Sequence, residues 1–230
     1  MSWTDLIAVE NIIKLKKQFN MDTAIVTGTF RGFDAELYSH YFENVLTMDI
    51  SEEYLEIAKS RLKGNNKIAI FKMPSESFIK YFRRTYDVAN SNDTIYFYLD
   101  AHFYDPEARQ KWVCVEELKA LEGFKNCVIC IHDFDNGKFG HLVYEGEHFG
   151  WNIVGEHIQK VNPNFHYYTN YRTDIVTDLT VSMLPIKYDD WMRDSLKYVH
   201  SSIEKRHRGM LFATPEPLNL KNYQLVEFKC

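Results

Sequence analysis

Short apolar runs alternate with amphipathic stretches along the first 131 residues of the chain. Nearly every position is apolar within each of five runs, at residues 24–26, 45–48, 68–71, 95–99 and 128–131. Runs of this length that are apolar on both faces are typical of strands buried between two layers of a parallel sheet. The pattern therefore predicts five central strands that are covered on both sides.

The segments between these runs carry helical spacing. After the second run, Ser51 is a suitable N-cap, and Leu55, Ala58 and Leu62 recur on one helical face before Gly64. Strands that alternate with helices imply right-handed crossover connections. The predicted fold is α/β: a Rossmann-like, doubly wound three-layer α/β/α sandwich.

The ends of the chain complete this prediction. Residues 2–19 are amphipathic and predict a helix that covers one side of the sheet, while residues 148–161 predict a later helix. Strands at 165–168 and 209–213 would complete a mostly parallel, seven-stranded sheet with an antiparallel edge strand. Residues 1–230 would form a single domain, with an insertion at 169–208 that serves as a lid, a substrate wall or a contact in a homo-oligomer.

Composition and charge limit the class of partner. Lys and Arg total 27 and Asp and Glu total 32, a net charge of -5, so no broad basic field for nucleic acid is expected. No apolar stretch approaches the ~20 residues of a membrane span, and the N-terminus lacks the order of a signal peptide. We expect no membrane association and a cytoplasmic location. Cys127 and Cys130 would point to opposite faces of a strand, which favours reduced thiols over a metal or redox pair.

The first strand runs into a glycine turn. Gly28 and Gly32 follow the run at 24–26, and the second run ends at Asp49. Glycines allow a backbone to approach a ligand, and a helix N-terminus offers unpaired N–H groups. A carboxylate after the second strand can accept hydrogen bonds from both ribose hydroxyls. This layout is typical of a nucleoside site.

Polar residues also follow the later strands, where ligands bind in open parallel sheets. Residues 73–76 follow the third run, Asp100-Ala101-His102 follow the fourth, and His132-Asp133-Phe134-Asp135 follow the fifth. The carboxyl ends of parallel strands lie at one edge, so these side chains are expected to gather there.

Over residues 20–135 the sequence resembles the class I S-adenosylmethionine-dependent methyltransferases. Four segments carry the resemblance by their order and spacing: residues 26–32, Met48-Asp49, residues 98–102 and Ile131-His132-Asp133. The turn Leu99-Asp100-Ala101-His102 is most similar to the branch of small-molecule and sugar O-methyltransferases. The resemblance implies S-adenosylmethionine as cofactor and methyl transfer to a hydroxyl of a small molecule or sugar.

The resemblance also implies roles for individual residues. The glycine loop would wrap the methionine part of the cofactor, Asp49 would bind the ribose hydroxyls, and Asp100 would lie near the sulfonium. The candidate cofactor-binding residues are Thr27, Gly28, Thr29, Phe30, Gly32, Asp49, Ser75, Glu76 and Asp100. The candidate catalytic residues are Asp100, His102 and His132.

A metal is one interpretation of the acidic strand ends. Some members of the family hold a divalent cation there, which makes Asp100 and Asp133 candidate ligands. Carboxylates suit Mg²⁺, while His102 or His132 would shift the preference toward Mn²⁺ or Zn²⁺. The same acids and imidazoles suit general-base chemistry without a metal, or a structural role in which an Asp caps a helix and the histidines hydrogen-bond in the loop.

Departures from the family pattern keep two other functions open. Val26 stands where the family usually has an acid that binds the amino group of the cofactor, and residues 73–76 lack the usual Asp for adenine, for which Ser75 or Glu76 would substitute. A non-catalytic, methyltransferase-like binding protein is therefore one alternative. The other takes Asp133-Phe134-Asp135 as the DxD motif of a metal-dependent glycosyltransferase, in which the glycine loop has no role. The basic run at 205–208 is interpreted as a solvated helix end.

Overall fold

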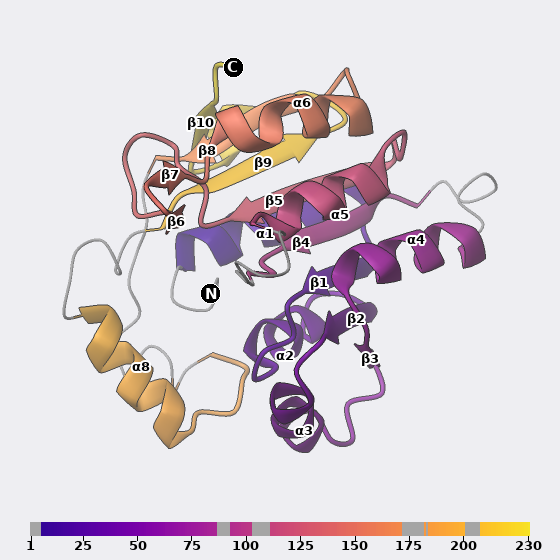
Figure 1. Cartoon of the computed structure of the whole chain (residues 1–230), viewed down its shortest axis with the longest axis vertical. Coiled ribbons are helices and arrows are strands. Elements are labelled where there is room, and N and C mark those ends of the chain that lie inside the picture. Colours follow the sequence, from indigo (N-terminus) through magenta and orange to yellow (C-terminus); the bar gives the residue numbers. More distant parts are fainter. Residues whose placement is uncertain (1–5, 87–92, 103–110, 172–181, 183, 201–207) are drawn as a thin grey trace.

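The five apolar runs form neighbouring parallel strands, as predicted. The run at 68–71 differs from the prediction of a central, fully covered strand, because it lies at an edge of the sheet and is only partly buried. The computed structural model describes residues 6–86, 93–102, 111–171, 182, 184–200 and 208–230. The strands run in the order β3-β2-β1-β4-β5 (Figure 1). Their bounds are Thr23–Thr27 for β1, Asn44–Asp49 for β2, Ile68–Lys72 for β3, Ile95–Leu99 for β4 and Cys127–His132 for β5.

The other half of the sheet corrects two details of the prediction. β8 (His166–Asn170), β9 (Met210–Thr214) and β10 (Leu225–Glu227) extend the sheet to eight strands, in the order β10-β8-β9-β5. The antiparallel strand β9 is not at an edge, because it pairs with both β5 and β8. The edge strand on this side of the sheet is β10, which is also antiparallel. It was missed because only Leu225 of its three residues is buried, which leaves no apolar run to detect.

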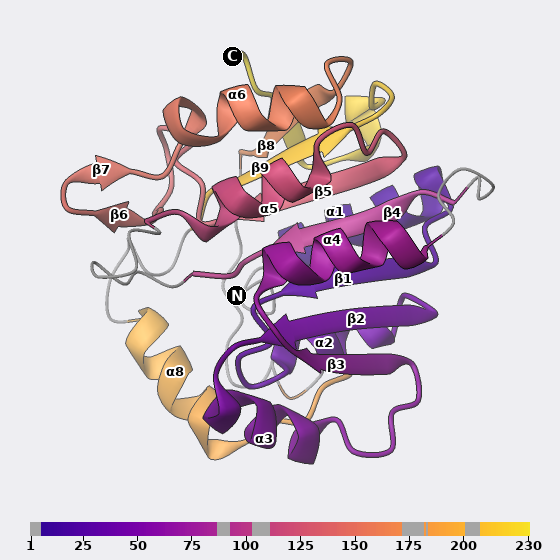
Figure 2. The same cartoon turned by 45° about the vertical axis from the view of Figure 1, so that its right-hand side comes forward.

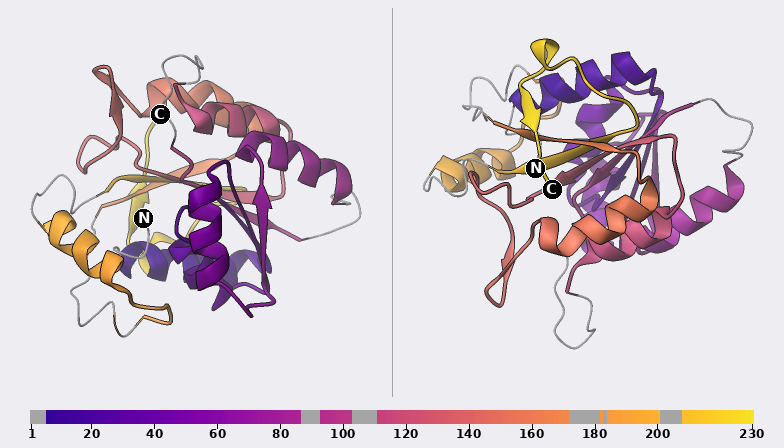
Figure 3. Two further views of the ribbon diagram at one scale, coloured as in Figure 1. Left: turned by 60° about the horizontal axis from the view of Figure 1, so that its bottom comes forward. Right: turned by 90° about the horizontal axis from the view of Figure 1, so that it is seen from above.

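Helices cover both faces of the sheet and confirm the three-layer architecture (Figure 3). The bounds on one face are Ser75–Thr85 for α4, Val113–Leu121 for α5 and Trp151–Val161 for α6. On the other face they are Leu6–Phe19 for α1, Phe33–Ser39 for α2 and Glu52–Arg61 for α3. Phe97 packs with the α4–α6 layer, while its neighbours Tyr96 and Tyr98 pack with the α1–α3 layer. No helix in the described ranges is both long enough and apolar enough to cross a membrane.

The cysteines lie as predicted. Cys127 belongs to the apolar cluster under α4–α6, and Cys130 belongs to the cluster on the opposite face. All four cysteines, including Cys114 and Cys230, are free. Strand alternation therefore keeps the two thiols apart on opposite faces of the sheet.

Part of the predicted insertion packs beside the first two helices. α8 (Asp190–His200) buries Met192 and Leu196 against Phe33 and Leu37 of α2 and Val9 of α1. Residues 172–181, 183 and 201–207 of the insertion lie outside the described residues, as do residues 2–5 of the predicted first helix and residues 205–207 of the basic run.

Arg61 connects the α8 region to the body of the fold. Its guanidinium lies 3.1 Å from Oε2 of Glu36, donates to the carbonyl of Lys187 at 2.6 Å and pairs with Asp189. It also covers the ring of Phe33, with 3.9 Å between the guanidinium carbon and the ring centroid. This buried cation therefore joins α2, α3 and the segment that enters α8.

Arg61→Met should lower the free energy of unfolding by about 2 kcal/mol, because Glu36 would remain as an unpaired buried carboxylate. Urea denaturation measures this change. Lys59→Met on the same helix is the control, since the Lys59–Glu56 pair is exposed and such pairs contribute roughly 0–1 kcal/mol. Equal effects of the two substitutions would contradict the role given to Arg61.

Candidate active site

A cavity of about 1250 Å³ opens at the carboxyl ends of the parallel strands. It brings together most of the predicted site residues: Gly28, Thr29, Phe30, Asp49, Ser75, Glu76, Asp100, His102, His132 and Asp133 line it. Thr27 and Gly32 do not line it. The site that was expected from strand ends far apart in sequence is therefore one continuous space.

The first glycine is required by a close backbone contact. Gly28 has a φ of +74°, and a Cβ at this position would lie 3.0 Å from the carbonyl oxygen of Asp100 and 3.1 Å from the Cα of Ala101. Thr27 is fully buried and holds the same turn: its Oγ1 accepts the amide N–H of Asp100 at 3.1 Å. The turns after β1 and β4 are thereby packed backbone to backbone.

Asp49 holds the glycine loop in place. Its Oδ2 accepts the amide N–H of Phe30 at 2.8 Å, and its Oδ1 accepts that of Ser51 at 2.9 Å. Phe30 has a left-handed φ of +47°, which is uncommon for a residue with a side chain. Each carboxylate oxygen has a second lone pair and Asp49 lines the cavity, so Asp49 can brace the loop and still accept ligand hydroxyls.

Gly32 serves packing. It caps α2 with a φ of +82°, and a Cβ there would lie 3.1 Å from Cδ1 of Leu62 and 3.3 Å from the Cβ of Ala58. Both contacts belong to the α3 region. Val26 is also turned away from the cavity, because it is 1% exposed within the α1–α3 layer.

Trp191 of α8 forms one wall of the cavity together with aromatic side chains of the glycine loop, α2 and α3. The ring of Trp191 stacks on Phe33 with 5.1 Å between centroids and meets Phe30 edge to face at 5.3 Å. Phe30 in turn contacts Tyr54 at 4.6 Å. Trp191 and Ser195 line the cavity, so the described part of the insertion contributes directly to the site.

Two acids and two histidines meet at the ends of β4 and β5. Nδ1 of His132 lies 3.0 Å from Oδ1 of Asp100 and 3.1 Å from Oδ1 of Asp133. Nε2 of His102 lies 3.1 Å from Oδ1 of Asp100 and 3.6 Å from Oδ2 of Asp133. Asp133 holds this position with a left-handed φ of +59°. The predicted catalytic residues Asp100, His102 and His132 are thus in one network.

The electrostatics of this network favour ion pairs. Burial alone would lower the pKa of His132, but the charges of Asp133 and Asp100 outweigh it and raise that pKa to about 9. Burial alone would raise the pKa of each acid, but His132 and the other cationic groups nearby hold the pKa of Asp100 and Asp133 below the usual range. His132 is therefore a cation at neutral pH.

Sequence reasoning missed one member of this network. The Nε of Arg208 donates a hydrogen bond to Oδ1 of Asp133, and the Arg208 side chain is 23% exposed. The interpretation of the basic run as a solvated helix end is wrong for this residue, because Arg208 pairs its backbone with Gly140, pairs its side chain with Asp133 and lines the cavity. No sequence signal distinguished Arg208 from its three basic neighbours.

A second missed residue lies beneath the cavity. Glu117 of α5 is fully buried, and neither of its carboxyl oxygens has a hydrogen-bond partner among the described residues, although the hydroxyls of Ser75 and Thr27 and the imidazole of His102 lie nearby. Burial raises the pKa of Glu117 to about 7, although these neighbours act in the opposite direction. Its spacing from Cys114 and Leu121 places it on the buried face of the helix, and this signal could have identified it.

A short hairpin flanks the cavity opposite α8. β6 (Val143–Tyr144) and β7 (Glu147–His148) form a separate two-stranded sheet that projects at the carboxyl end of the large sheet (Figure 2). Trp112, beside the start of α5, stacks on Tyr144 with 4.9 Å between centroids and donates to Glu147 at 3.1 Å. Leu142 and Val143 line the cavity.

Comparison with known proteins supports the fold. No protein-family model and no curated protein sequence matches the chain. Two solved spermidine synthases, one in complex with the transition state analogue AdoDATO and one from Thermotoga maritima, superpose with TM-scores of 0.52 and 0.51 at 16% and 14% identity. These alignments cover 95% of this chain, but only 64% and 62% of the synthases, so the chain spans less than two thirds of their length.

A third solved structure is a SAM-dependent methyltransferase from Anabaena variabilis ATCC 29413. It aligns over 90% of this chain and 84% of its own, with a TM-score of 0.46 and 15% identity. Identities this low show the fold alone. The chain therefore has the Rossmann-like α/β/α fold that its sequence predicts, and its activity has to be argued from the site.

Proposed function

We propose that this protein is an S-adenosylmethionine-dependent methyltransferase that acts on a hydroxyl of a small molecule or sugar. The observation that carries the proposal is the single cavity that joins the Gly28–Asp49 edge to the network of Asp100, His102, His132 and Asp133. One end suits a nucleoside, and the other offers groups that can take a proton from a hydroxyl. A cofactor and an acceptor would then share one continuous space.

The cofactor end fits S-adenosylmethionine in three respects. The glycine loop lines the cavity with Gly28, Thr29 and Phe30. Asp49 can accept the ribose hydroxyls, and Ser75 and Glu76 line the cavity where adenine is expected. Asp34, in the first turn of α2, also lines the cavity. We assign to it the cationic amino group of the cofactor, because the side chain of Val26 cannot reach the cavity.

At the acceptor end, His102 is the proposed base. The bound cofactor supplies an electrophilic methyl group on a sulfonium. His102 would take the proton of the attacking hydroxyl, and Asp100, 3.1 Å from its Nε2, would stabilise the imidazolium that forms. His132 is already protonated at neutral pH, so its role is to orient and neutralise the two acids.

The ligand atoms of Asp100, His102, His132 and Asp133 lie within 4.8 Å of one another, but the charge balance of this cluster disfavours a hard divalent cation. The negative charges of Asp100 and Asp133 are balanced by Arg208 and the protonated His132. A divalent cation would enter a cluster with no net charge and would have to displace the proton of His132. We therefore derive no step through a metal at this position.

Millimolar Mg²⁺ should accordingly leave the melting temperature unchanged, because no preferential binding to the folded state is expected. Thermal melts with and without Mg²⁺, on wild type and on Asp133→Asn, measure this. A rise in wild type that Asp133→Asn abolishes would contradict the charge argument and assign a metal to these acids.

The DxD alternative has little support. Phe134 is fully buried, and the carboxylates on either side of it belong to different clusters: Asp133 lies with His132 and His102, and Asp135 lies with His141 and His148. A glycosyltransferase DxD motif needs both acids to serve one cation. The glycine loop, which that function would leave without a role, lines the cavity here.

The test of the proposed function separates binding from catalysis. S-adenosylhomocysteine titrated into the wild type should bind, and labelled S-adenosylmethionine should transfer its methyl group to a member of a panel of hydroxylated compounds. His102→Gln should bind S-adenosylhomocysteine with unchanged affinity but lose roughly 100-fold in kcat. Binding without any transfer would favour the non-catalytic alternative, and absence of binding would refute the proposal.

A further inference from the structure

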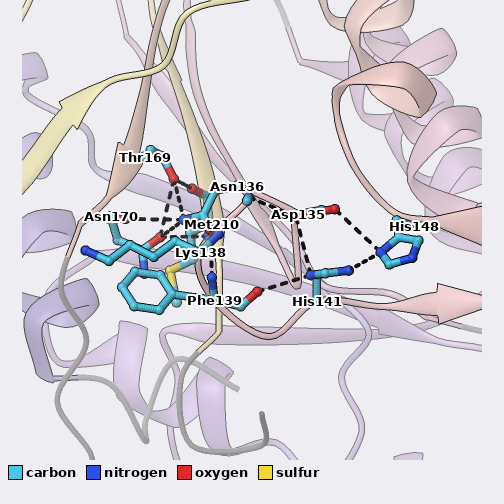
Figure 4. Close-up of polar contacts among 10 residues, drawn as sticks. Asp135, Asn136, Lys138, Phe139, His141, His148, Thr169, Asn170 and Met210 are labelled. Carbon is cyan, nitrogen blue, oxygen red and sulfur yellow. Dashed lines mark hydrogen bonds and ion pairs between the residues drawn. The ribbon is translucent and has the colours of Figure 1, made fainter. Parts of the chain in front are cut away.

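Three metal-ligating side chains gather outside the network described above. Asp135 follows the end of β5, His141 precedes β6, and His148 lies on β7 (Figure 4). Nε2 of His141 is 2.6 Å from Nδ1 of His148, and Oδ2 of Asp135 is 3.6 Å from the same Nδ1. No step of the proposed methyl transfer uses these residues.

The backbone holds the three residues together. Leu142 donates its amide N–H to the carbonyl of Asp133 at 3.0 Å, and Phe149 donates to the carbonyl of Leu142 at 2.9 Å. Asp135 donates to the carbonyl of Phe149 at 2.6 Å. These hydrogen bonds fold the hairpin base onto the end of β5, so the ligand atoms converge on a scaffold with regular backbone pairing.

The remaining polar atoms of two of these side chains already have backbone partners. Nδ1 of His141 lies 3.1 Å from the carbonyl oxygen of Phe139 and can donate to it, which leaves the lone pair on Nε2. Oδ1 of Asp135 accepts the amide N–H of Gly137 at 2.8 Å, which leaves Oδ2. Metal-binding histidines usually donate their other ring N–H in this way, because that bond fixes the tautomer and the ring orientation.

We propose that Asp135, His141 and His148 form a binding site for a divalent transition metal of the zinc class. Two imidazole nitrogens and one carboxylate oxygen suit such borderline ions better than Mg²⁺ or Ca²⁺, and three protein ligands leave a position for water. Bonds of about 2.0–2.1 Å in a tetrahedral site separate neighbouring ligand atoms by about 3.3 Å. The observed separations of 2.6 and 3.6 Å bracket this distance.

The proton balance of binding is simple. With Nδ1 of His141 protonated, the 2.6 Å contact requires a proton on Nδ1 of His148. The metal takes the place of that proton, which moves by exchange with water to Nε2 of His148, whose side chain is 58% exposed. The imidazole of His148 stays neutral, so metal binding releases no net proton. The carboxylate of Asp135 then supplies the one negative charge among the three ligands.

A metal at this site would fix one wall of the cavity. It would connect the end of β5 to both sides of the β6–β7 hairpin, and His141 and Leu142 line the cavity itself. The site would therefore hold the hairpin in place against the acceptor end. This inference does not depend on methyl transfer, because its readout is metal binding to the protein without cofactor.

The test titrates the metal-free, full-length protein with Zn²⁺ in a calorimeter and with Co²⁺ under visible absorption. We expect wild type to bind one equivalent with a tetrahedral Co²⁺ spectrum and a higher melting temperature. His148→Ala and Asp135→Asn should each lose this equivalent; Asp135→Asn keeps an oxygen for the Gly137 N–H. His166→Ala, which removes an exposed imidazole on β8, is the matched control and should bind as wild type does.

The outcome also separates this site from the neighbouring acids. Binding that survives Asp133→Asn but not His148→Ala supports the proposal. Binding that survives both His148→Ala and Asp135→Asn, or absence of Zn²⁺ and Co²⁺ binding to wild type, would overturn it. Melting curves without metal show whether each variant is folded, since His148 is exposed and its loss should leave the apo protein intact.

Discussion

Gly28→Ala should reduce binding of S-adenosylhomocysteine below detection in a protein that still folds. The new Cβ would lie 3.0 Å from the carbonyl oxygen of Asp100 and 3.1 Å from the Cα of Ala101, and both are backbone atoms that cannot rotate away. Either the β1 turn or the β4 turn must shift. The cofactor loop and the acids at the end of β4 would then lose their relative positions, and misplacement of this kind costs binding and rate steeply.

Gly64→Ala is the matched control for backbone strain. Gly64 has a φ of +85°, close to the +74° of Gly28, but a Cβ there would meet nothing within 4 Å. Both variants should lose roughly 1–3 kcal/mol of stability from left-handed backbone, while only Gly28→Ala should lose the ligand. Calorimetric titration and urea denaturation measure the two effects separately. If Gly28→Ala folds and binds S-adenosylhomocysteine with wild-type affinity, the cofactor site is not at the β1 turn.

The parallel strands could be located from the sequence because their residues form short, nearly unbroken apolar runs. β4 shows this: all five of its residues are buried, so the run at 95–99 appeared unbroken. β10 was missed for the opposite reason, since Val226 and Glu227 are exposed on an edge strand. Whether a strand lies at an edge depends on the whole sheet, and a strand of three residues has too short a sequence pattern to be predicted.

The candidate site was predictable where it follows strand ends. Asp49, Asp100 and Asp133 come directly after apolar runs, and the rule that ligands bind at carboxyl ends of parallel strands brought them together. Arg208 could not be found this way, because its approach to Asp133 depends on how residues more than seventy positions apart pair in space. The same holds for Asp135 with His141 and His148, which the hairpin geometry joins.

The role of Gly32 shows the limit of reading a glycine motif. Spacing alone treats Gly28 and Gly32 as equivalent members of a ligand loop. In three dimensions only Gly28 meets the β4 turn, while Gly32 meets Leu62 and Ala58. A glycine in such a motif can serve backbone approach or helix packing, and only the direction of its missing side chain distinguishes the two.

Glu117→Gln should stabilise the protein by about 3 kcal/mol at pH 8 and by much less at pH 4.5. In the unfolded chain this carboxyl titrates near its ordinary value of 4.5, whereas burial raises its pKa to about 7 in the folded protein. Between these values the folded state binds more protons than the unfolded state, so the free energy of unfolding falls as the pH rises. Above pH 7 the full cost of ionising the buried carboxyl lowers the free energy of unfolding of the wild type. Glutamine does not ionise, so Glu117→Gln avoids this loss.

Urea denaturation of wild type and Glu117→Gln at several values between pH 4.5 and 8 measures this difference. The control is Glu116→Gln, one position earlier on α5, where the side chain is 38% exposed and paired with Lys119. Its effect should be small and should not grow with pH across this window. A Glu117→Gln effect that stays constant with pH would mean that Glu117 ionises as easily in the folded protein as in the unfolded chain. The carboxyl beneath Ser75 and His102 would then be charged at neutral pH, and its burial would have to be offset by contacts other than those described.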